Sequence, residues 1–143
     1  MKPRVWGPYI WTSIHLVALG YPEKPTAVDK LNYKLFFSTL GNVLPCSKCT
    51  KNYSRHFMEL PIDKFLESRE SLFNWTVKLH NIVNAETGTP VWSEKKALAY
   101  YTRLVKTGNN SFESSNHESS ELLIVMSIAF VIIMVGLVWF RKL

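Results

Sequence analysis

The C-terminal part of the chain contains a run of nineteen residues without a charged side chain, from Leu122 to Phe140. As a helix this run would be ~28 Å long, which is close to the ~30 Å hydrocarbon core of a bilayer. A helix buried in a soluble domain rarely stays apolar on every face over such a length. We therefore expect a C-terminal transmembrane helix over residues 122–140.

This run divides the 143-residue chain into three parts. Residues 108–121 are rich in Ser, Asn and Glu, a composition typical of a linker. Residues 1–107 remain as the working domain, whose length suits one hydrophobic core. The N-terminal residues lack the apolar run of a signal peptide, so we expect the anchored domain to face the cytosol. Arg141 and Lys142 directly follow the run and favour the opposite orientation, so the sidedness stays open.

The working domain is basic, with fifteen Lys and Arg residues against eight Asp and Glu. This excess favours acidic partners or an anionic membrane surface. The basic residues are scattered and no nucleic-acid-binding motif is present, so no nucleic-acid partner is expected. Two cysteines are too few for a secreted domain that several disulfides hold together.

Apolar residues in the working domain follow the period of a helix rather than that of a strand. The pattern predicts helices over residues 8–19, 26–40 and 46–57, a short turn over 62–66, and helices over 71–83 and 93–105. Thr26 and Ser93 are suited to N-caps, and Pro45 is suited to the first turn of the third helix. Val28, Leu31, Leu35 and Phe36 share one side of the second helix. No segment alternates like a strand, so the predicted fold class is an all-α bundle with short connections.

Two cysteines three residues apart, Cys46 and Cys49, stand at the predicted start of the third helix. At this spacing the thiols face each other and can close a disulfide, while helix amides and Lys48 would stabilise a thiolate. The motif therefore favours redox chemistry. The alternatives are half of a zinc site or two incidental thiols. Because neither His56 nor His80 completes a common zinc spacing, no metal site is expected.

A second group of candidate residues lies on and after the fourth predicted helix. His80, Asn81 and Asn84 share one ridge, which offers an imidazole and two amides to the ribose, phosphate or adenine of a nucleotide. Trp75 and Trp92 offer faces for a ring system. The alternative for this group is a core histidine with cap-like asparagines.

A third group lies near the N-terminus. Trp6 and Gly7 precede Trp11 and His15, and the last two residues lie one helical turn apart, so that an indole and an imidazole share a face. Core packing is the alternative here as well.

The three motifs, in this order and at these distances, resemble the Erv/ALR family of FAD-linked sulfhydryl oxidases. The resemblance runs from Trp6 to about Leu104. The matching positions are WGxxxWxxxH (Trp6, Gly7, Trp11, His15), PCxxC (Pro45, Cys46, Cys49) and WxxxxHNxVNxxxGxPxW (Trp75, His80, Asn81, Val83, Asn84, Gly88, Pro90, Trp92). This resemblance implies a four-helix bundle with a short fifth helix and with FAD at the mouth of the bundle.

The resemblance also implies a role for each matching residue. Cys46 would exchange with a substrate dithiol, and Cys49 would lie against the flavin, which passes electrons to O₂ and yields H₂O₂. Thr89 stands where the family often has a basic residue that reaches the FAD phosphates, so Lys95 and Lys96 become the candidates. The implied cofactor contacts are Trp6, Gly7, Trp11, His15, Cys49, Trp75, His80, Asn81, Val83, Asn84, Trp92, Lys95 and Lys96.

The sequence departs from many family members in its cysteines. Val77 and Glu94 occupy the positions of a second, structural disulfide, and no shuttle CxxC accompanies Cys46 and Cys49. We therefore expect electrons to come directly from a separate thiol protein, such as a thioredoxin-like carrier. A minimal domain of this kind resembles the viral branch, which implies a place in the virion or the host membrane of a large DNA virus. By the same resemblance we expect a homodimer formed through the first helices.

Two other functions stay open at the level of the sequence. A membrane-anchored helical adaptor without flavin would use the CxxC pair structurally or for a metal. A dithiol–disulfide exchange protein without flavin would oxidise one partner and then stop.

Overall fold

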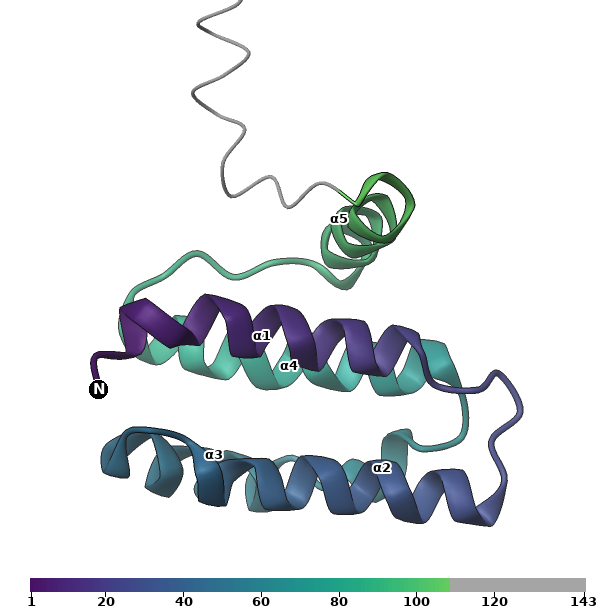
Figure 1. The fold of residues 1–143 in the computed structure, drawn as a ribbon, viewed down its shortest axis with the longest axis horizontal. Coiled ribbons are helices and arrows are strands. Elements are labelled where there is room, and N and C mark those ends of the chain that lie inside the picture. Colours follow the sequence, from purple (N-terminus) through teal and green to yellow (C-terminus); the bar gives the residue numbers. More distant parts are fainter. Residues whose placement is uncertain (109–143) are drawn as a thin grey trace, which may run out of the picture. The chain divides into compact units, whose positions relative to one another are not determined.

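The computed structural model describes residues 1–108, and every regular element within that range is helical (Figure 1). Met1–Thr102 form one compact unit, and a second unit begins at Arg103. The elements are α1 (Pro3–Leu19), α2 (Ala27–Leu40), η1 (Gly41–Val43), α3 (Ser47–Glu59), η2 (Ile62–Phe65), α4 (Arg69–Thr87) and α5 (Glu94–Thr107), where η denotes a 3₁₀ helix. The predicted all-α class is confirmed for this range. The fifth helix is not shorter than the others, since its 14 residues equal the length of α2.

The predicted transmembrane helix, residues 122–140, lies outside the described residues. The same holds for the predicted linker beyond its first residue. Within residues 1–108 no helix combines the length and apolar character that a membrane crossing needs.

The helix starts follow the predicted capping chemistry at two of three positions. Thr26 forms a capping box with Asp29, in which the Asp29 amide donates to Thr26 Oγ1 at 3.2 Å and the Thr26 amide donates to Asp29 Oδ2 at 2.8 Å. Ser93 accepts from the Lys96 amide at the start of α5. Pro45 is an exception, because it precedes α3 instead of entering the first turn. Cys46 takes the cap position, with extended backbone and a thiol sulfur as acceptor.

Helices α3 and α5 each end two residues later than the sequence predicted, and α1 and α4 extend further beyond their predicted bounds. Helix α1 begins at Pro3 rather than at Pro8, because Pro3 already supplies the preset backbone angle of a first turn and Pro8 is tolerated inside the helix. Helix α4 begins at Arg69, after the cap residue Ser68, and continues past Val83. It ends only at Gly88, whose φ of 69° suits a residue without Cβ.

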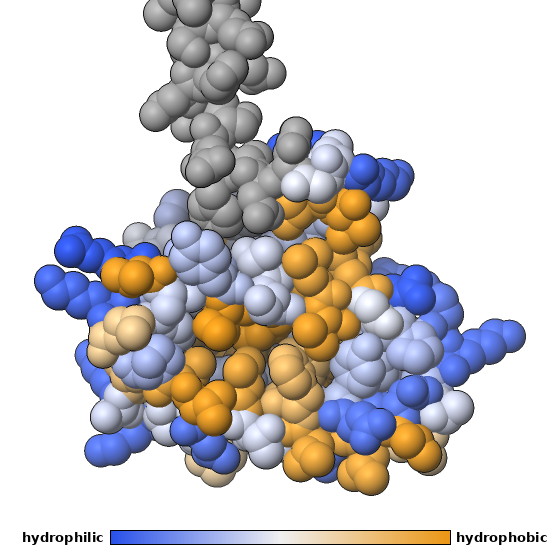
Figure 2. Space-filling view, viewed as in Figure 1, coloured by the Kyte–Doolittle hydropathy of each residue, from blue (hydrophilic) through white to orange (hydrophobic). Residues whose placement is uncertain are grey.

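The apolar row of α2 lies at the surface. Val28, Leu31 and Leu35 are between 57% and 65% exposed and Phe36 is 39% exposed, although their spacing is that of a buried helix face. Figure 2 shows apolar residues gathered over the area that α1 and α2 occupy in Figure 1. The buried contact of α2 comes from Phe37 instead.

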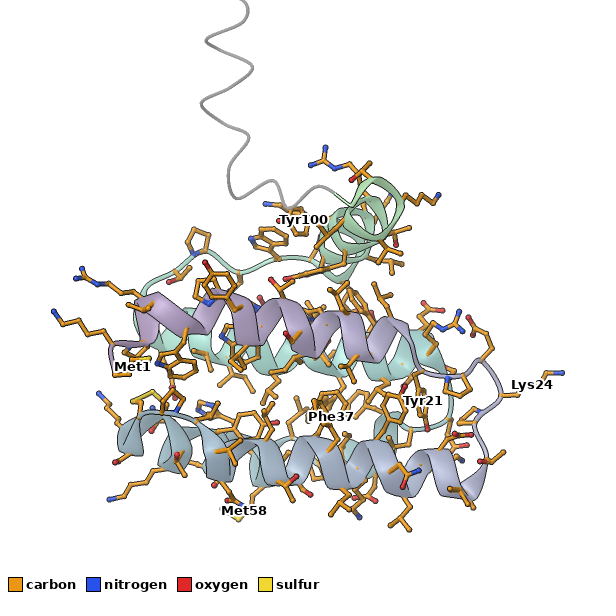
Figure 3. The ribbon with its side chains drawn as sticks, viewed as in Figure 1. Met1, Tyr21, Lys24, Phe37, Met58 and Tyr100 are labelled. Atoms are coloured by element: carbon orange, nitrogen blue, oxygen red, sulfur yellow. A yellow bond between two sulfur atoms is a disulfide. The ribbon has the colours of Figure 1, made fainter. Side chains whose placement is uncertain are left out.

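The core is aromatic and joins α2, α3 and α4. Phe37 points into the interior (Figure 3), and its ring centroid lies 5.1 Å from that of Trp75 on α4. The ring of Phe57 on α3 lies against the same indole at 5.8 Å. The Trp75 indole N–H donates to the carbonyl of Leu60 at 2.9 Å, so this ring is buried without losing a hydrogen bond. On the other side of α4, α1 packs along its length.

Helix α3 approaches the end of α2 closely at Gly41. A Cβ atom at Gly41 would lie 2.6 Å from Cδ1 of Tyr53, a distance that the fold cannot accept without a shift. Tyr53 cannot move freely, because it is buried and its hydroxyl donates to the Phe37 carbonyl at 2.8 Å. The absence of a side chain at Gly41 therefore sets the position of α3 against α2.

We expect Gly41→Ala to lower the free energy of unfolding by about 1–3 kcal/mol, the usual range for overpacking. Urea unfolding of the full chain measures this change. In a Tyr53→Leu background the same substitution should cost much less, because the clashing ring is absent. An equal loss in both backgrounds would show that the Gly41–Tyr53 contact is not the cause.

Candidate functional site

The two cysteines form a disulfide at the N-terminal end of α3, at the same end of the bundle as Met1 (Figure 3). Their Cα atoms are 5.1 Å apart, and the Cys49 amide donates to Cys46 Sγ at 3.2 Å. The first turn of α3 holds no acidic side chain, while Lys48 lies between the cysteines. Helix amides and this cation favour a thiolate over a thiol when the pair is reduced.

A cavity of about 540 Å³ lies inside the bundle next to the disulfide. Its size is typical of a small-molecule or cofactor site. Of the sequence-predicted site residues it brings together both cysteines, Trp6, Gly7, Trp11 and Val83. Residues of α1, α3 and α4 supply most of its wall, so the inner cavity depends on the packing of three helices.

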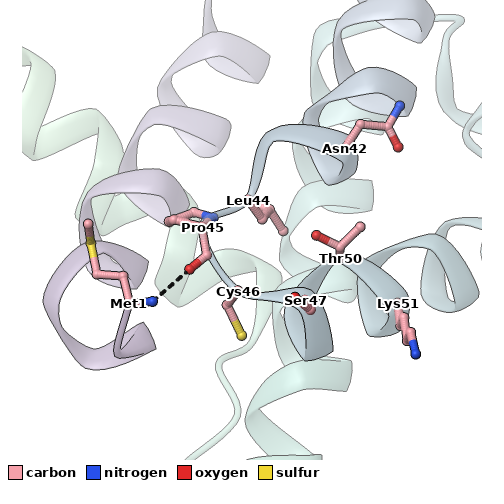
Figure 4. A pocket seen from close by; sticks show the side chains of 8 residues that line it. All are labelled: Met1, Asn42, Leu44, Pro45, Cys46, Ser47, Thr50 and Lys51. Carbon is pink, nitrogen blue, oxygen red and sulfur yellow. Dashed lines mark hydrogen bonds between the residues drawn. The ribbon is translucent and has the colours of Figure 1, made fainter.

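A second hollow of about 550 Å³ opens on the other side of Cys46 (Figure 4). Its wall contains polar side chains such as Asn42, Ser47 and Thr50. The Met1 amino group donates to the Pro45 carbonyl at 3.0 Å across one edge of it. Cys46 lines both hollows, whereas Cys49 lines only the inner cavity among these two. The two sulfurs therefore face different surroundings although they are bonded to each other.

Two histidines, buried His15 and half-buried His80, connect α1 to α4 beside this cavity. His15 Nδ1 lies 2.8 Å from Thr76 Oγ1, and His15 Nε2 lies 3.1 Å from His80 Nδ1. The Thr76 hydroxyl donates to the Phe73 carbonyl, so it accepts from His15 Nδ1–H. His15 Nε2 then accepts from His80 Nδ1–H, and both imidazoles are neutral in this arrangement.

Burial favours the same neutral state. Desolvation, with a smaller contribution from His80, lowers the pKa of His15 to about 3. Desolvation lowers the pKa of His80 to about 4. The His80 ring stacks on Trp11 with ring centroids 4.0 Å apart and planes within 6°. Neither histidine lines the inner cavity, but His80 supports the indole that does.

The remaining predicted site residues lie away from the inner cavity. The Asn81 side chain is bonded in both directions to the backbone of Trp92, at 2.7 and 2.9 Å. Asn84 donates to the Pro90 carbonyl at 3.3 Å. These asparagines hold the segment between α4 and α5 against α4. Trp75 lies in the core, where it packs against Phe37 and Phe57.

Neither predicted phosphate ligand lines the inner cavity. Lys96 lies over the Trp92 ring with its Nζ atom 4.5 Å from the centroid. Nothing in the structure engages Lys95 with the cavity. The cofactor roles of both lysines, and of the asparagines and Trp92, stay predictions.

The inner cavity also contains functional groups that the three sequence motifs do not include, among them His56, which the sequence offered only as a zinc ligand. Tyr53 and His56 follow Cys49 by four and seven residues, so all three lie on one face of α3. Arg55 and Glu86 lie at the same wall, and their side chains pair at 2.6 Å. Helical spacing from Cys49 could have identified His56. Among the described residues no group of His, Cys, Asp or Glu side chains could hold a metal ion.

Two buried polar atoms in the wall of this cavity lack a hydrogen-bond partner within the described part of the chain. They are Nε1 of Trp6 and Nδ1 of His56. Buried polar atoms are rarely left unpaired, since each then loses its bond to water without replacement. Their positions in one cavity indicate a polar ligand there.

Comparison with known proteins gives a consistent result. Residues 8–102 match the Erv1 / Alr family model. The chain is 50% identical over 101 residues to a probable FAD-linked sulfhydryl oxidase of Acanthamoeba polyphaga mimivirus, covering 70% of this chain and 66% of the relative. It is 25% identical over 140 residues to a putative FAD-linked sulfhydryl oxidase of Invertebrate iridescent virus 3, covering 96% of this chain and 94% of the relative.

Solved structures share this fold. The FAD-binding domain of Erv1 from Saccharomyces cerevisiae matches with a TM-score of 0.66 and 30% identity, covering 71% of this chain and 94% of that one. The match to the whole mitochondrial FAD-linked sulfhydryl oxidase of the same yeast covers 56% of this chain and only 41% of the relative, at 35% identity.

The histidine pair predicts a pH-dependent stability. Because both pKa values are lower in the folded chain than the ~6.5 of an unfolded histidine, only the unfolded chain gains protons as the pH falls below about 6.5. The free energy of unfolding should therefore drop by about 2 kcal/mol for each histidine between pH 7 and pH 5. Urea unfolding at the two pH values measures this drop. His80→Gln retains an amide that can bond to His15, and this variant should show only about half of the drop. An unchanged drop would contradict the assignment of the pH dependence to these two histidines.

Proposed function

This chain belongs to the Erv1/Alr family, and on that premise we propose that it is an FAD-linked sulfhydryl oxidase. It oxidises protein dithiols to disulfides through the Cys46–Cys49 pair. The observation that carries this function is the position of the disulfide between an open hollow and an inner cavity, with Cys46 facing both. Such a position lets one sulfur meet a protein substrate while its partner meets a bound cofactor.

The residues at the inner cavity fit FAD. Trp6 and Trp11 offer indole surfaces to a flat ring, and the unpaired Trp6 Nε1 offers a hydrogen-bond donor. Lys48 is a cation in the cavity wall that suits a phosphate, beside the predicted Lys95 and Lys96. When bound, FAD supplies the two-electron transfer from the reduced cysteines to O₂, which yields H₂O₂.

The cysteines perform the exchange with substrate. A substrate thiolate attacks Cys46 Sγ, the Cys46–Cys49 bond breaks, and Cys49 leaves as a thiolate. The second substrate thiol then attacks the mixed disulfide and releases Cys46, so the substrate loses two electrons and the CxxC pair gains them. The N-terminal amides of α3 and the ammonium of Lys48 stabilise the thiolates that form. The pair must be reoxidised before another cycle.

The apolar row of α2 supports a homodimer. Val28, Leu31, Leu35 and Phe36 are exposed along one side of this helix. Contiguous apolar surface of this kind marks interaction sites in soluble domains. The family resemblance favours a second copy of the chain as the partner that covers this row, because the resemblance implies a dimer interface on the first helices.

Residues 122–140 support attachment to a membrane. Their uncharged sequence is long enough for a bilayer. A cytosol-facing oxidase in the virion or host membrane of a large DNA virus would form disulfides where glutathione otherwise keeps thiols reduced. Because Cys46 and Cys49 are the only cysteines in the sequence, the substrate is a separate thiol protein such as a thioredoxin-like carrier.

The spectrum of the purified full chain tests the proposed function. We expect the absorption bands of a bound flavin and continuous O₂ consumption with dithiothreitol. A colourless chain that takes up no FAD would favour the helical adaptor. A chain that oxidises one equivalent of dithiol and then stops would favour a dithiol–disulfide exchange protein.

The two cysteines should fail in different ways when they are replaced. Cys49→Ser should retain FAD and lose turnover. When this variant is treated with a disulfide such as oxidised glutathione, its Cys46 thiolate attacks that disulfide, one glutathione leaves as a thiolate, and the mixed disulfide accumulates because no neighbouring thiol remains to displace the second glutathione. Cys46→Ser should lose turnover and form the adduct more slowly, because Cys49 lines only the inner cavity of the two hollows. Mass spectrometry of the alkylated protein measures the adduct. Faster adduct formation on Cys49 in Cys46→Ser than on Cys46 in Cys49→Ser would reverse the two roles.

Disruption of the α2 row tests the dimer. The double variant Leu31→Lys, Leu35→Lys places two charges in the proposed interface, where they would be desolvated without partners. We expect sedimentation to show a dimer for the wild-type chain and a monomer for the variant, with helix content unchanged. A matched variant at exposed Met58 on α3, Met58→Lys, should leave the dimer intact.

A further inference from the structure

One buried histidine in the inner cavity has no part in the thiol exchange. His56 lies seven residues after Cys49 on the same face of α3, and its side chain is completely buried. Its Nε2 atom lies 3.0 Å from Oε1 of Glu86 on α4. Its Nδ1 atom has no hydrogen-bond partner within residues 1–108. The imidazole is thus held at one nitrogen and unpaired at the other.

His15 shows what a histidine with a structural role looks like in the same fold. Both of its ring nitrogens have partners inside the protein, Thr76 on one side and His80 on the other. His56 is as deeply buried, yet only one nitrogen is paired by the described residues. Since an unpaired buried nitrogen destabilises the fold, the difference indicates a partner from outside the described residues.

We propose that His56 is a cofactor-contacting residue, whose Nδ1 atom forms a hydrogen bond with the ring system of FAD in the inner cavity, and that Glu86 is its positioning residue. The inference rests on the proposed function, because it assigns a further contact to the same cofactor. It adds two residues that lie outside the CxxC motif, the tryptophan motif and the histidine–asparagine motif.

His56 Nε2 lies against two groups of opposite hydrogen-bonding character. It is 3.0 Å from Glu86 Oε1 and 2.9 Å from Arg55 Nη2, which only donates. Hydrogen bonds from Arg55 and, secondarily, from His56 lower the pKa of Glu86, so this side chain is a carboxylate at neutral pH and only accepts. Nδ1 accepts when Nε2 donates to Glu86, and it donates when Nε2 accepts from Arg55. The pyrimidine part of the oxidised isoalloxazine ring carries both an N–H group and carbonyl oxygens, so it offers a partner to Nδ1 in either case.

Arg55 completes the arrangement from the protein surface. Its Nη2 atom lies 2.6 Å from the same Glu86 oxygen, and its Nη1 atom lies 3.4 Å from Glu59. Glu59 contacts Arg55. Glu59 itself makes no contact with His56 and does not line the inner cavity. Glu59 and Glu86 are thus two carboxylates on one arginine, of which only Glu86 reaches the imidazole. This pair supplies a matched control.

Titration of FAD into the cofactor-stripped full chain, with the visible spectrum as readout, tests the inference. His56→Phe fills the site without a nitrogen, so we expect FAD to bind about tenfold more weakly. The flavin absorption bands of the FAD that still binds should shift relative to wild type. The cofactor-free variant should unfold at no lower urea concentration than the cofactor-free wild type, because an unpaired nitrogen has been removed. His56→Gln should restore part of the affinity.

Glu86→Gln tests the positioning role on a partly exposed side chain, which spares the core. We expect weaker FAD binding, by about threefold, together with a band shift in the same direction as for His56→Phe. Glu59→Gln should leave both the affinity and the bands as in wild type.

The outcomes separate the two proposals. A wild-type chain that binds no FAD overturns the proposed function and this inference with it. Wild-type FAD binding together with unchanged affinity and bands in His56→Phe overturns this inference alone. If His56→Phe does not fold, unchanged affinity and bands in Glu86→Gln overturn it instead. A shift shared equally by Glu86→Gln and Glu59→Gln assigns the effect to Arg55 and also overturns it.

Discussion

The start of α3 is the constraint on which the site depends. Cys46 caps the N-terminus of this helix with its own sulfur, so the residue proposed to meet substrate also begins the helix that carries Cys49. Three residues of separation bring the sulfurs within bonding distance because the cap is extended and the following residue is helical. The same geometry directs the helix amides at the pair. Capping, disulfide formation and thiolate stabilisation are consequences of one local backbone arrangement.

The rest of the cavity depends on how α3 is held against its neighbours. Gly41 admits the Tyr53 ring, and Phe57 and Trp75 fill the space between α3 and α4. With α3 fixed in this way, its helical period brings Cys49, Tyr53 and His56 to one wall. Helix α1 forms the opposite wall through Trp6 and Trp11. The aromatic rings between α3 and its neighbours therefore determine the width of a cavity suited to a flat ring.

Much of this arrangement was accessible from the sequence. The CxxC pair, the Trp11–His15 turn and the caps at Thr26 and Ser93 all depend on local spacing, and local spacing is what a single sequence records. The bounds of α4 were less accessible, because the C-terminal end depends on a left-handed glycine beyond an otherwise helical run. The pairing of His56 with Glu86 could not be predicted, since thirty residues separate them and only the α3–α4 packing joins them.

The second helix shows a different limit. An apolar stripe at helical spacing indicates that a face is withdrawn from water, but the pattern does not say what covers it. Phe37, adjacent to the stripe, makes the core contact, while Val28, Leu31 and Leu35 remain exposed. Unpaired polar groups support the same kind of inference. An exposed row of apolar side chains indicates a missing apolar partner, and a buried unpaired nitrogen such as Nδ1 of His56 indicates a missing polar partner. Unsatisfied groups of both kinds occur in this domain, and they point to two different partners: a small polar ligand within the bundle and a protein surface against α2.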